Sequence, residues 1–288
     1  MTAVAAGTRV RARERRTRRG RGTGWMFSLL AWLFGLIFVA PVLWMLLTSL
    51  HSESDAATNP PAIAAHLTFK GYSDFFGSDP WPALINSATA AIFSTLVVLC
   101  LATPAAYALS IRPVRKWTDV MFFFLSTKFL PAVAALLPVY LIAKNLHLLD
   151  NIVTLVLIYA AANLPIAVWM MRSFLAELPR EMLEAAELDG AGLPTLMRRI
   201  ILPLTMPGLA ATSLICFIFA WNELLFARVI TSTVAETSPV FLTGFITSEG
   251  LFLAKLCAAS LVVSLPVIVA GFAAQDKLVQ GLSLGAVK

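Results

Sequence analysis

RSFLAELPREMLEAAELDGAGLPTLMRRIILPLT (residues 172–205) is a polar segment between two long apolar runs. Pro179 suits the start of a helix, because its missing N–H would have no intrahelical partner there. Three acidic residues then recur at helical spacing on one face: Glu181, Glu184 and Glu187. The segment therefore predicts a short acidic helix of about ten residues, placed where a partner protein could grip it.

The second half of the segment predicts an elbow and another short helix. Gly190 can adopt the left-handed conformation that ends many helices. Pro194 can start a second short helix, and Pro203 can stop it before the next apolar run. We therefore expect two short helices that meet at a Gly-rich turn.

The composition places the rest of the chain in a bilayer. Of its 288 residues, 59% are hydrophobic and 13% are charged, and its mean hydropathy is +0.81. This is too apolar for one soluble domain. The net charge of +6 does not indicate nucleic acid binding, since eight of the 22 basic residues lie between Arg9 and Arg21, directly before the first apolar run.

Six apolar runs are long enough to span a membrane, which predicts an all-α polytopic protein with six transmembrane helices. They cover residues 25–47, 83–111, 120–143, 152–171, 206–226 and 256–274. We expect three parts: a basic cytoplasmic tail at 1–24, the transmembrane domain at 25–274 with a cytoplasmic loop at 172–205, and a cytoplasmic tail at 275–288. The first run lacks a small-residue cleavage site, which indicates an uncleaved span rather than an export signal.

The basic residues predict the orientation of these spans. In this topology 17 of the 22 basic residues fall on one side of the membrane and four on the other. Lys and Arg accumulate in cytoplasmic loops. We therefore expect a plasma (inner) membrane protein with both termini in the cytoplasm.

The sequence offers no site for a reaction of its own. It has no GxxxxGK[ST] loop for ATP, and no Gly-Lys pair at all. Its three histidines fall in expected outer loops, and each cysteine lies inside an apolar run without metal-ligand spacing. We therefore expect neither an enzyme nor a resident metal or cofactor. An integral-membrane enzyme, the distant alternative, would gather polar residues near the interface, and these spans hold only scattered ones.

The segment 184–207 resembles the cytoplasmic coupling motif of permease subunits in ATP-binding-cassette (ABC) importers. The motif residues stand in the family's order and spacing: Glu184, Ala185, Ala186, Asp189, Gly190, Ala191, Leu202, Pro203 and Pro207. In that family the first short helix docks in a groove of a separate ATPase subunit and transmits its closure. The resemblance implies that Glu184 pairs with basic groups of the ATPase, while Ala185 and Ala186 allow close approach. Asp189 and Gly190 would form the elbow. The alternative is an ordinary amphipathic helix on the membrane surface.

Nearly the whole chain is similar to the carbohydrate-uptake subfamily of these permeases, the maltose-type inner-membrane subunits. The likeness includes Trp221-Asn222-Glu223, LPVIV at 265–269 and the closing residues 281–288. It implies the type I importer permease fold and the import of sugars or polyols. The implied partners are a second permease, two ATPase subunits that bind ATP and Mg, and an extracytoplasmic solute-binding protein. The outer loop after the first span, about 32 residues, is too small for a folded domain, so this protein would dock on loops alone.

Two further contacts follow from the same resemblance. The outer loop 236–250 would reach into the binding protein, with Thr243, Gly244, Thr247 and Ser248. The closing residues would enter the ATPase dimer as an extended segment, in which glycines allow close backbone approach; they include Gly281, Leu282, Gly285 and Lys288. A frayed terminus without a role is the alternative for this tail.

Lys128 lies about 13 Å from the inner end of the third span, close to the middle of the bilayer. A charge there costs several kcal/mol unless it is paired or wetted. We expect it to face the partner permease or a watery translocation path, where Tyr140, Asn163 or a partner carboxylate could satisfy it. Helix packing or snorkelling is the alternative. Asn222 and Glu223, in the outer third of the fifth span, could form an external gate or be solvated at the interface.

Two other transporter classes stay open at this point. One is an ABC permease for amino acids, phosphate or peptides, against which only the closing residues and the Trp-Asn-Glu segment speak. The other is a proton- or sodium-coupled secondary transporter, which would usually show inverted repeats and acidic residues at mid-membrane. This chain shows neither clearly.

Overall fold

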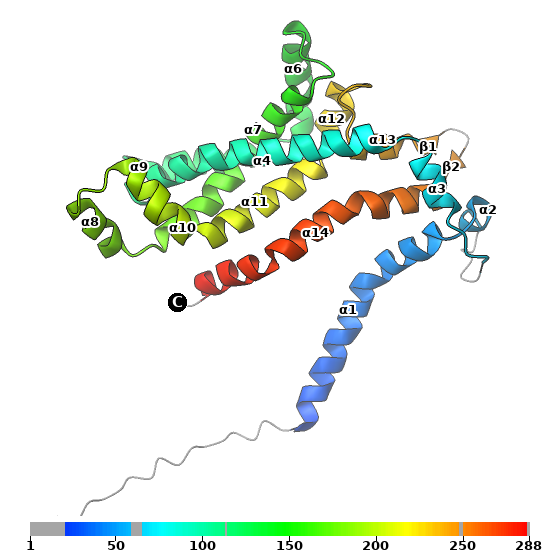
Figure 1. Ribbon diagram of the computed structural model, residues 1–288, viewed down its shortest axis with the longest axis horizontal. Coiled ribbons are helices and arrows are strands. Elements are labelled where there is room, and N and C mark those ends of the chain that lie inside the picture. Colours follow the sequence, from blue (N-terminus) through cyan, green and yellow to red (C-terminus); the bar gives the residue numbers. More distant parts are fainter. Residues whose placement is uncertain (1–20, 59–64, 113, 248–249, 287–288) are drawn as a thin grey trace, which may run out of the picture. The chain divides into compact units, whose positions relative to one another are not determined.

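A computed structural model of the chain describes residues 21–58, 65–112, 114–247 and 250–286 (Figure 1). It divides into two units, residues 1–46 and residues 47–288. Helix α1 (Arg21–Ser49) makes up the described part of the first unit and ends three residues inside the second. Its apolar run from Trp25 to Ser49 is long enough to cross a membrane.

The second unit is built on four helices that lie side by side (Figure 1). Helix α4 (Trp81–Ser110) packs against α7 (Ile152–Ala176), α11 (Met206–Trp221) packs against both, and α14 (Leu253–Ala286) packs against α11. Small residues permit this close approach along α4, because Ser87, Ala90, Ala91, Ser94, Ala102 and Ala106 are all buried. Small side chains at the contact are how helices associate where no water drives them together.

The third expected span is broken in the middle. Helices α5 (Trp117–Phe129) and α6 (Ala132–Asn145) meet at an angle of 90°. The break falls at Leu130 and Pro131, both of which have extended ψ angles near +125°. Proline restricts the residue before it to extended conformations, which accounts for the position of the break.

A second bend lies directly before the fifth expected span, slightly later than the sequence predicts. Helix α9 (Leu193–Leu196) runs into a π-helical turn, η1 (Met197–Ile201), and then into α10 (Leu202–Leu204). The helix that was expected to stop at Pro203 ends one residue later, at Leu204, and still before the next apolar run. The π-helical turn ends just before Pro203 and leaves it in the first turn of α10, where no N–H is needed. The bend, of 77°, follows one residue after α10, at Thr205.

Short elements connect the helices at the expected outer end of the second unit: α2 (Glu53–Ala56), α3 (Lys70–Phe76), α12 (Leu225–Ile230), α13 (Ser238–Thr243), β1 (Ile246–Thr247) and β2 (Gly250–Leu251). The two strands form an antiparallel hairpin, a small addition to an otherwise helical fold. The Glu53 carboxylate accepts hydrogen bonds from the N–H groups of Ala254 and Lys255. It thereby caps the N-terminus of α14.

The helical membrane fold expected from the sequence is confirmed. In the described part of the chain, four helices are long and apolar enough to span a membrane, and two bent pairs bring the number to six if each pair is one span. The closing residues differ from expectation. Helix α14 continues to Ala286, so residues 281–286 are helical rather than extended. A running helix adds residues cooperatively, and two glycines cost only about 1 kcal/mol each.

Candidate functional site

The expected acidic helix is α8 (Arg180–Leu188), which begins after an extended Pro179. Its end is closed by two backbone hydrogen bonds, from Gly190 to Glu187 and from Ala191 to Ala186. Gly190 has φ +82°, so the left-handed cap predicted for it is confirmed. A side chain would find open space at this position. Glycine is therefore required there for its backbone conformation and not for lack of room.

Helix α8 is fixed to the protein by one face. Leu183 is buried and Ala186 is partly buried, in a cluster with Leu175, Leu196 and Ile201. The other face carries Glu184 and Ala185, which are exposed, and ends in Leu188, whose exposed fraction is 88%. The residues predicted to contact an ATPase thus lie on an open helix face with a rigid back.

Two contacts tie this region to the expected cytoplasmic turn before α5. The Arg112 guanidinium donates a hydrogen bond to the Glu187 carboxylate on α8 at 2.5 Å. This hydrogen bond and the charge of Glu187 raise the pKa of Arg112. The Arg172 guanidinium, near the end of α7, lies 4.0 Å from the centre of the Trp117 ring at the start of α5. The first contact joins α8 to the turn between α4 and α5, and the second joins α7 to the start of α5.

Asp189, Leu202 and Pro203 complete the expected coupling residues. Asp189 ends α8, and its N–H donates to Ala185. Leu202 and Pro203 lie in α10, which the Thr205 hydroxyl joins to η1 through a hydrogen bond to the carbonyl of Ile201.

A second group of expected residues lines one cavity at the break between α5 and α6. Three of them meet there: Lys128, Asn163 and Glu223. The cavity, of about 280 Å³, is completed by Ala132, Tyr159, Ala162, Phe219, Ala220 and Phe226. We call it the Lys128 cavity. Lys128 is 35 positions from Asn163 and 95 from Glu223 in the sequence. They are brought together by α5, α7 and the short segment that follows α11.

The two charged groups of the Lys128 cavity differ in their partners. Glu223 uses both carboxylate oxygens to accept backbone N–H groups of α12, from Phe226 at 2.9 Å and Ala227 at 3.1 Å. The Lys128 ammonium instead lies 5.9 Å from the centre of the Phe219 ring. In the part of the chain that the structure describes, the ion pair found joins Arg112 to Glu187. Lys128 has no carboxylate partner there.

Tyr140 and Asn222 do not lie in the Lys128 cavity, so the expectation that Tyr140 satisfies Lys128 is wrong. Tyr140 stands on α6, beyond the break, in a separate hollow with Val133 and Val229. The 90° bend directs that part of α6 away from Lys128. Asn222 ends α11 and donates its side-chain amide to the carbonyl of Ile218.

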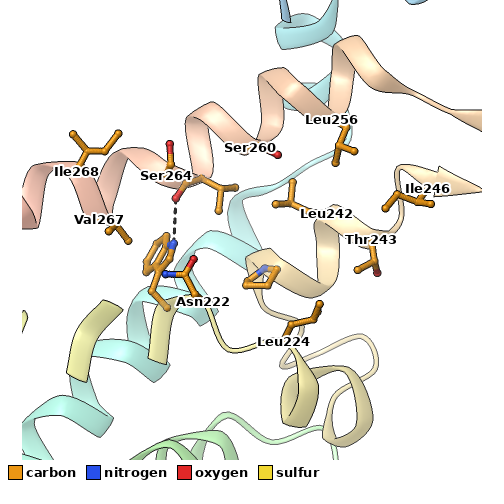
Figure 2. A pocket seen from close by; sticks show the side chains of 13 residues that line it. Asn222, Leu224, Leu242, Thr243, Ile246, Leu256, Ser260, Ser264, Val267 and Ile268 are labelled. Atoms are coloured by element: carbon orange, nitrogen blue, oxygen red, sulfur yellow. Dashed lines mark hydrogen bonds between the residues drawn. The ribbon is translucent and has the colours of Figure 1, made fainter. Parts of the chain in front are cut away.

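Asn222 lines a third cavity, of about 470 Å³, together with Thr243 from the outer loop (Figure 2). Figure 2 shows Ser260, Ser264 and Ile268 of α14 on its other side. The indole N–H of Trp221 donates to the carbonyl of Val263 and holds α11 to α14 there. Asn222, expected at an external gate, and Thr243, expected to contact the binding protein, therefore line the same cavity.

The other expected contact residues lie at the edges of the described structure. Gly244 ends α13, and Thr247 pairs with Gly250 in the hairpin. Gly281, Leu282 and Gly285 lie in the last turns of α14. Ser248 and Lys288 fall outside the described residues.

Sequence patterns missed two residues with clear structural roles. Tyr159 is buried in the Lys128 cavity, and its spacing of four from Asn163 on α7 could have indicated a shared face. Asp150 accepts hydrogen bonds from the backbone of residues 232–235, and no local pattern announces a contact over 80 residues of chain. Among the described residues, no group of three or more His, Cys, Asp or Glu is arranged to hold a metal ion.

Comparison with known proteins assigns the chain to a family. The family model described as "Binding-protein-dependent transport system inner membrane component" matches residues 99–283. The chain belongs to this family. It is 36% identical to the probable ABC transporter permease protein y4oR of Sinorhizobium fredii, over 91% of this chain and 95% of that protein. It is 34% identical to the trehalose transport system permease protein SugB of Mycobacterium tuberculosis, over 86% of this chain and 92% of that protein.

The fold of this membrane permease also matches a solved structure. A crystal structure of a bacterial ABC transporter involved in the import of the acidic polysaccharide alginate has a chain that aligns with a TM-score of 0.72. The alignment covers 91% of this chain and 98% of that chain, at 23% identity. At this identity the match concerns the fold alone.

Proposed function

We propose that this permease forms half of the translocation path of an ATP-driven importer for sugars or polyols. Its partners are a second permease, two ATPase subunits that bind ATP and Mg, and an extracytoplasmic solute-binding protein. Family membership supports the importer class. The relative that transports trehalose aligns over nearly its whole length, which supports the sugar class.

The open face of α8 carries the proposal for coupling. Glu184 and Ala185 are exposed, while Leu183 on the opposite face is buried against α7 and η1. An ATPase that closes on α8 would therefore move the whole cluster rather than bend a loose loop. The Arg112–Glu187 contact extends this movement to the turn before α5, whose far end carries Lys128. Closure of the ATPase would thus reach the Lys128 cavity through α5 and α7.

We place the permease in the inner membrane with both termini in the cytoplasm. The support is the distribution of basic residues, 17 of 22 on the side of α8. The outer loop 236–250 then faces the binding protein. Asn222, Thr243 and Ser264 line the same cavity. A movement of the outer loop when the binding protein docks would therefore act on the outer end of the translocation path.

The coupling role is tested by two substitutions, each with a matched control. Glu184→Lys reverses a charge on the open face, and Gly190→Val forces a β-branched residue into a left-handed conformation. Glu177→Lys makes the same charge change at an exposed site outside α8. Gly192→Val adds the same side chain where φ is −68° and where an added Cβ would meet only a Pro194 atom at 3.9 Å.

Uptake by membrane vesicles and the amount of permease in the membrane are measured together. Glu184→Lys and Gly190→Val should each lower uptake by about tenfold or more, because a reversed charge at a protein contact costs several kcal/mol. The two controls should retain uptake. Wild-type uptake by both test variants would remove the coupling role. Labelled trehalose and a labelled amino acid mixture, compared in the same vesicles, test the sugar class: uptake of amino acids alone would contradict it.

A further inference from the structure

The Lys128 cavity lies at a place where the backbone itself is interrupted. Helix α5 ends at Phe129, one residue after Lys128, and α6 starts at Ala132. Broken helices at membrane depth occur where the chain lines a cavity or is covered by protein. A second hollow of about 550 Å³ adjoins the first and shares four lining residues with it: Lys128, Ala132, Ala162 and Phe226. The combined space is within the size range of small-ligand sites.

Lys128 is a cation without a counter-charge in this space. The nearest carboxylate in the lining, Glu223, is already engaged by two N–H groups of α12. The Phe219 ring, with its centre 5.9 Å away, offers only a weak cation–π contact. An uncompensated lysine within a span is costly, and such residues mark substrate or ion pathways. The described chain therefore supplies no anion for Lys128.

The rest of the lining suits a sugar. Tyr159 and Asn163 are 2% and 4% exposed, and both line the cavity. The Tyr159 hydroxyl lies beside the Glu223 carboxylate. Phe219 and Phe226 supply aromatic surface. A ligand with hydroxyl groups and an apolar ring face would use all of these.

We propose that the Lys128 cavity is a subsite for an anionic sugar, in which the Lys128 ammonium binds a carboxylate or sulfonate group of the transported molecule. Tyr159 and Asn163 bind its hydroxyl groups, and Phe219 packs against its ring. This inference rests on the proposed function, since it specifies the charge of the transported sugar. The anionic group of the sugar pairs with Lys128 only while the sugar passes through the cavity. After the sugar is released, the cavity is free to bind the next one.

The test uses the complete importer, reconstituted in lipid vesicles with its second permease and ATPase subunits. A water-soluble amine-acylating reagent is applied, and the acylation rates of Lys128 and Lys144 are followed by peptide mass spectrometry. Lys144, exposed at the far end of α6, is the internal control. The probes are sodium glucuronate, glucose as its neutral counterpart, and sodium sulfate as a bare anion.

Glucuronate at ten times its dissociation constant should slow acylation of Lys128 by about tenfold, by mass action, and leave Lys144 unchanged. Glucose and sulfate should slow it much less. Equal protection by glucose would show that the charge is not recognised, and equal protection by sulfate would show an adventitious ion only. Absence of protection by glucuronate overturns the proposal. The proposal is also overturned if Lys128 does not react in the assembled importer without sugar. If its reactivity then returns when the second permease is omitted, the charge belongs to a contact between the permeases.

Equilibrium binding of labelled glucuronate gives a second measurement. Lys128→Met should weaken binding by about tenfold or more, because a charge-assisted hydrogen bond is lost. Lys128→Arg, which keeps the cation, should weaken it much less, and Lys144→Met should leave it unchanged. Equal binding by the Met and Arg variants would contradict the proposal. Uptake of any labelled sugar, neutral or anionic, by the wild-type importer reports on the proposed function alone, so failure of the anionic subsite is distinguished from failure of sugar import.

Discussion

At the scale of single residues, Asp150 organises the expected outer surface around one carboxylate. It follows the end of α6 with φ +51°. Four successive N–H groups donate to it, from Ser232, Thr233, Val234 and Ala235, at 2.9 to 3.1 Å. Converging backbone N–H groups form a strong anion site. Burial would raise the pKa of Asp150, but these N–H groups outweigh it and hold the pKa well below its usual range.

We predict that Asp150→Ala loosens the loop 231–236. The lost hydrogen bonds correspond to about 1–2 kcal/mol, after allowance for partial exposure, or a 5- to 30-fold change in local opening. Hydrogen–deuterium exchange of amides 232–235 should accelerate by this factor. Asp150→Asn should show a smaller effect, because Asn tolerates positive φ and keeps one acceptor. Glu236→Gln removes a neighbouring charge as a control. Wild-type exchange rates in Asp150→Ala would contradict the clamp.

The pH dependence of this clamp has a definite sign. The folded pKa of Asp150 is lowered, so its contribution is fully present above the unfolded pKa of about 4. It is lost only as the pH falls through the lowered folded value. Protection of amides 232–235, corrected for intrinsic exchange, should therefore stay constant from neutral pH down to about pH 5. A loss of protection in that window would indicate another titrating group.

At the scale of single residues, the sequence predicts a role best where the role depends on the residue's own backbone conformation or on its place inside a span. Gly190 was predictable, because a left-handed cap is a local demand of the helix end. Lys128 stands out in the sequence because a charge is costly inside a span. Glu223 stands out for its place near the outer end of the fifth span, and its meeting with Lys128 was not predicted. Asp150 acts on residues more than 80 positions away, and only the folded chain reveals its partners.

At the scale of elements, the approach of α7 to α11 decides how the loop that carries α8 is held. Gly208 lies in the first turn of α11 and is buried against Phe174, near the end of α7. A Cβ added at Gly208 would come within 3.0 Å of the Phe174 ring. Glycine is therefore required here by the contact between helices, in contrast to Gly190.

We predict that Gly208→Ala destabilises the permease by about 1–3 kcal/mol, the usual cost of overpacking. Gly271→Ala makes the same change in α14 where an added Cβ meets no atom within 4 Å, and it should be neutral or slightly stabilising. Thermal unfolding of the detergent-solubilised importer compares the two. Adding Phe174→Ala to Gly208→Ala should recover part of the loss, since it removes the clashing ring. Equal melting temperatures for the two glycine variants would contradict this contact.

The helices themselves were largely predictable from apolar runs, but the exact places of their interruptions were not. The third expected span breaks at Pro131, whereas the helix that contains Pro203 continues through it and bends two residues later, at Thr205. Pro203 is accommodated because the π-helical turn η1 shifts the hydrogen bonding before it. Whether a proline breaks a helix depends on the N–H and carbonyl groups around it, which a linear sequence does not specify.

At the scale of the whole molecule, the length of α14 sets how far the chain reaches beyond the membrane. Its 34 residues correspond to about 51 Å of helix, against about 30 Å for the hydrocarbon core. The helix starts at the outer end, next to Glu53. In the proposed orientation its last turns extend toward the cytoplasm, on the side where the ATPase subunits are proposed to bind.

We predict that deletion of residues 281–288 weakens ATPase binding and lowers stimulated ATP hydrolysis several-fold. Gly281 and Gly285 are four positions apart on a helix, so they lie on one face and permit a close approach to another chain. Replacing both with alanine keeps the helix but adds bulk to that face, and it should reproduce part of the loss. Ser283→Ala, on a different face of the same turns, is the matched control and should retain activity. Assembly, stimulated ATP hydrolysis and uptake are measured together in reconstituted importer. If the truncated permease matches wild type in all three, the last turns of α14 have no role in the contact and end freely in solvent.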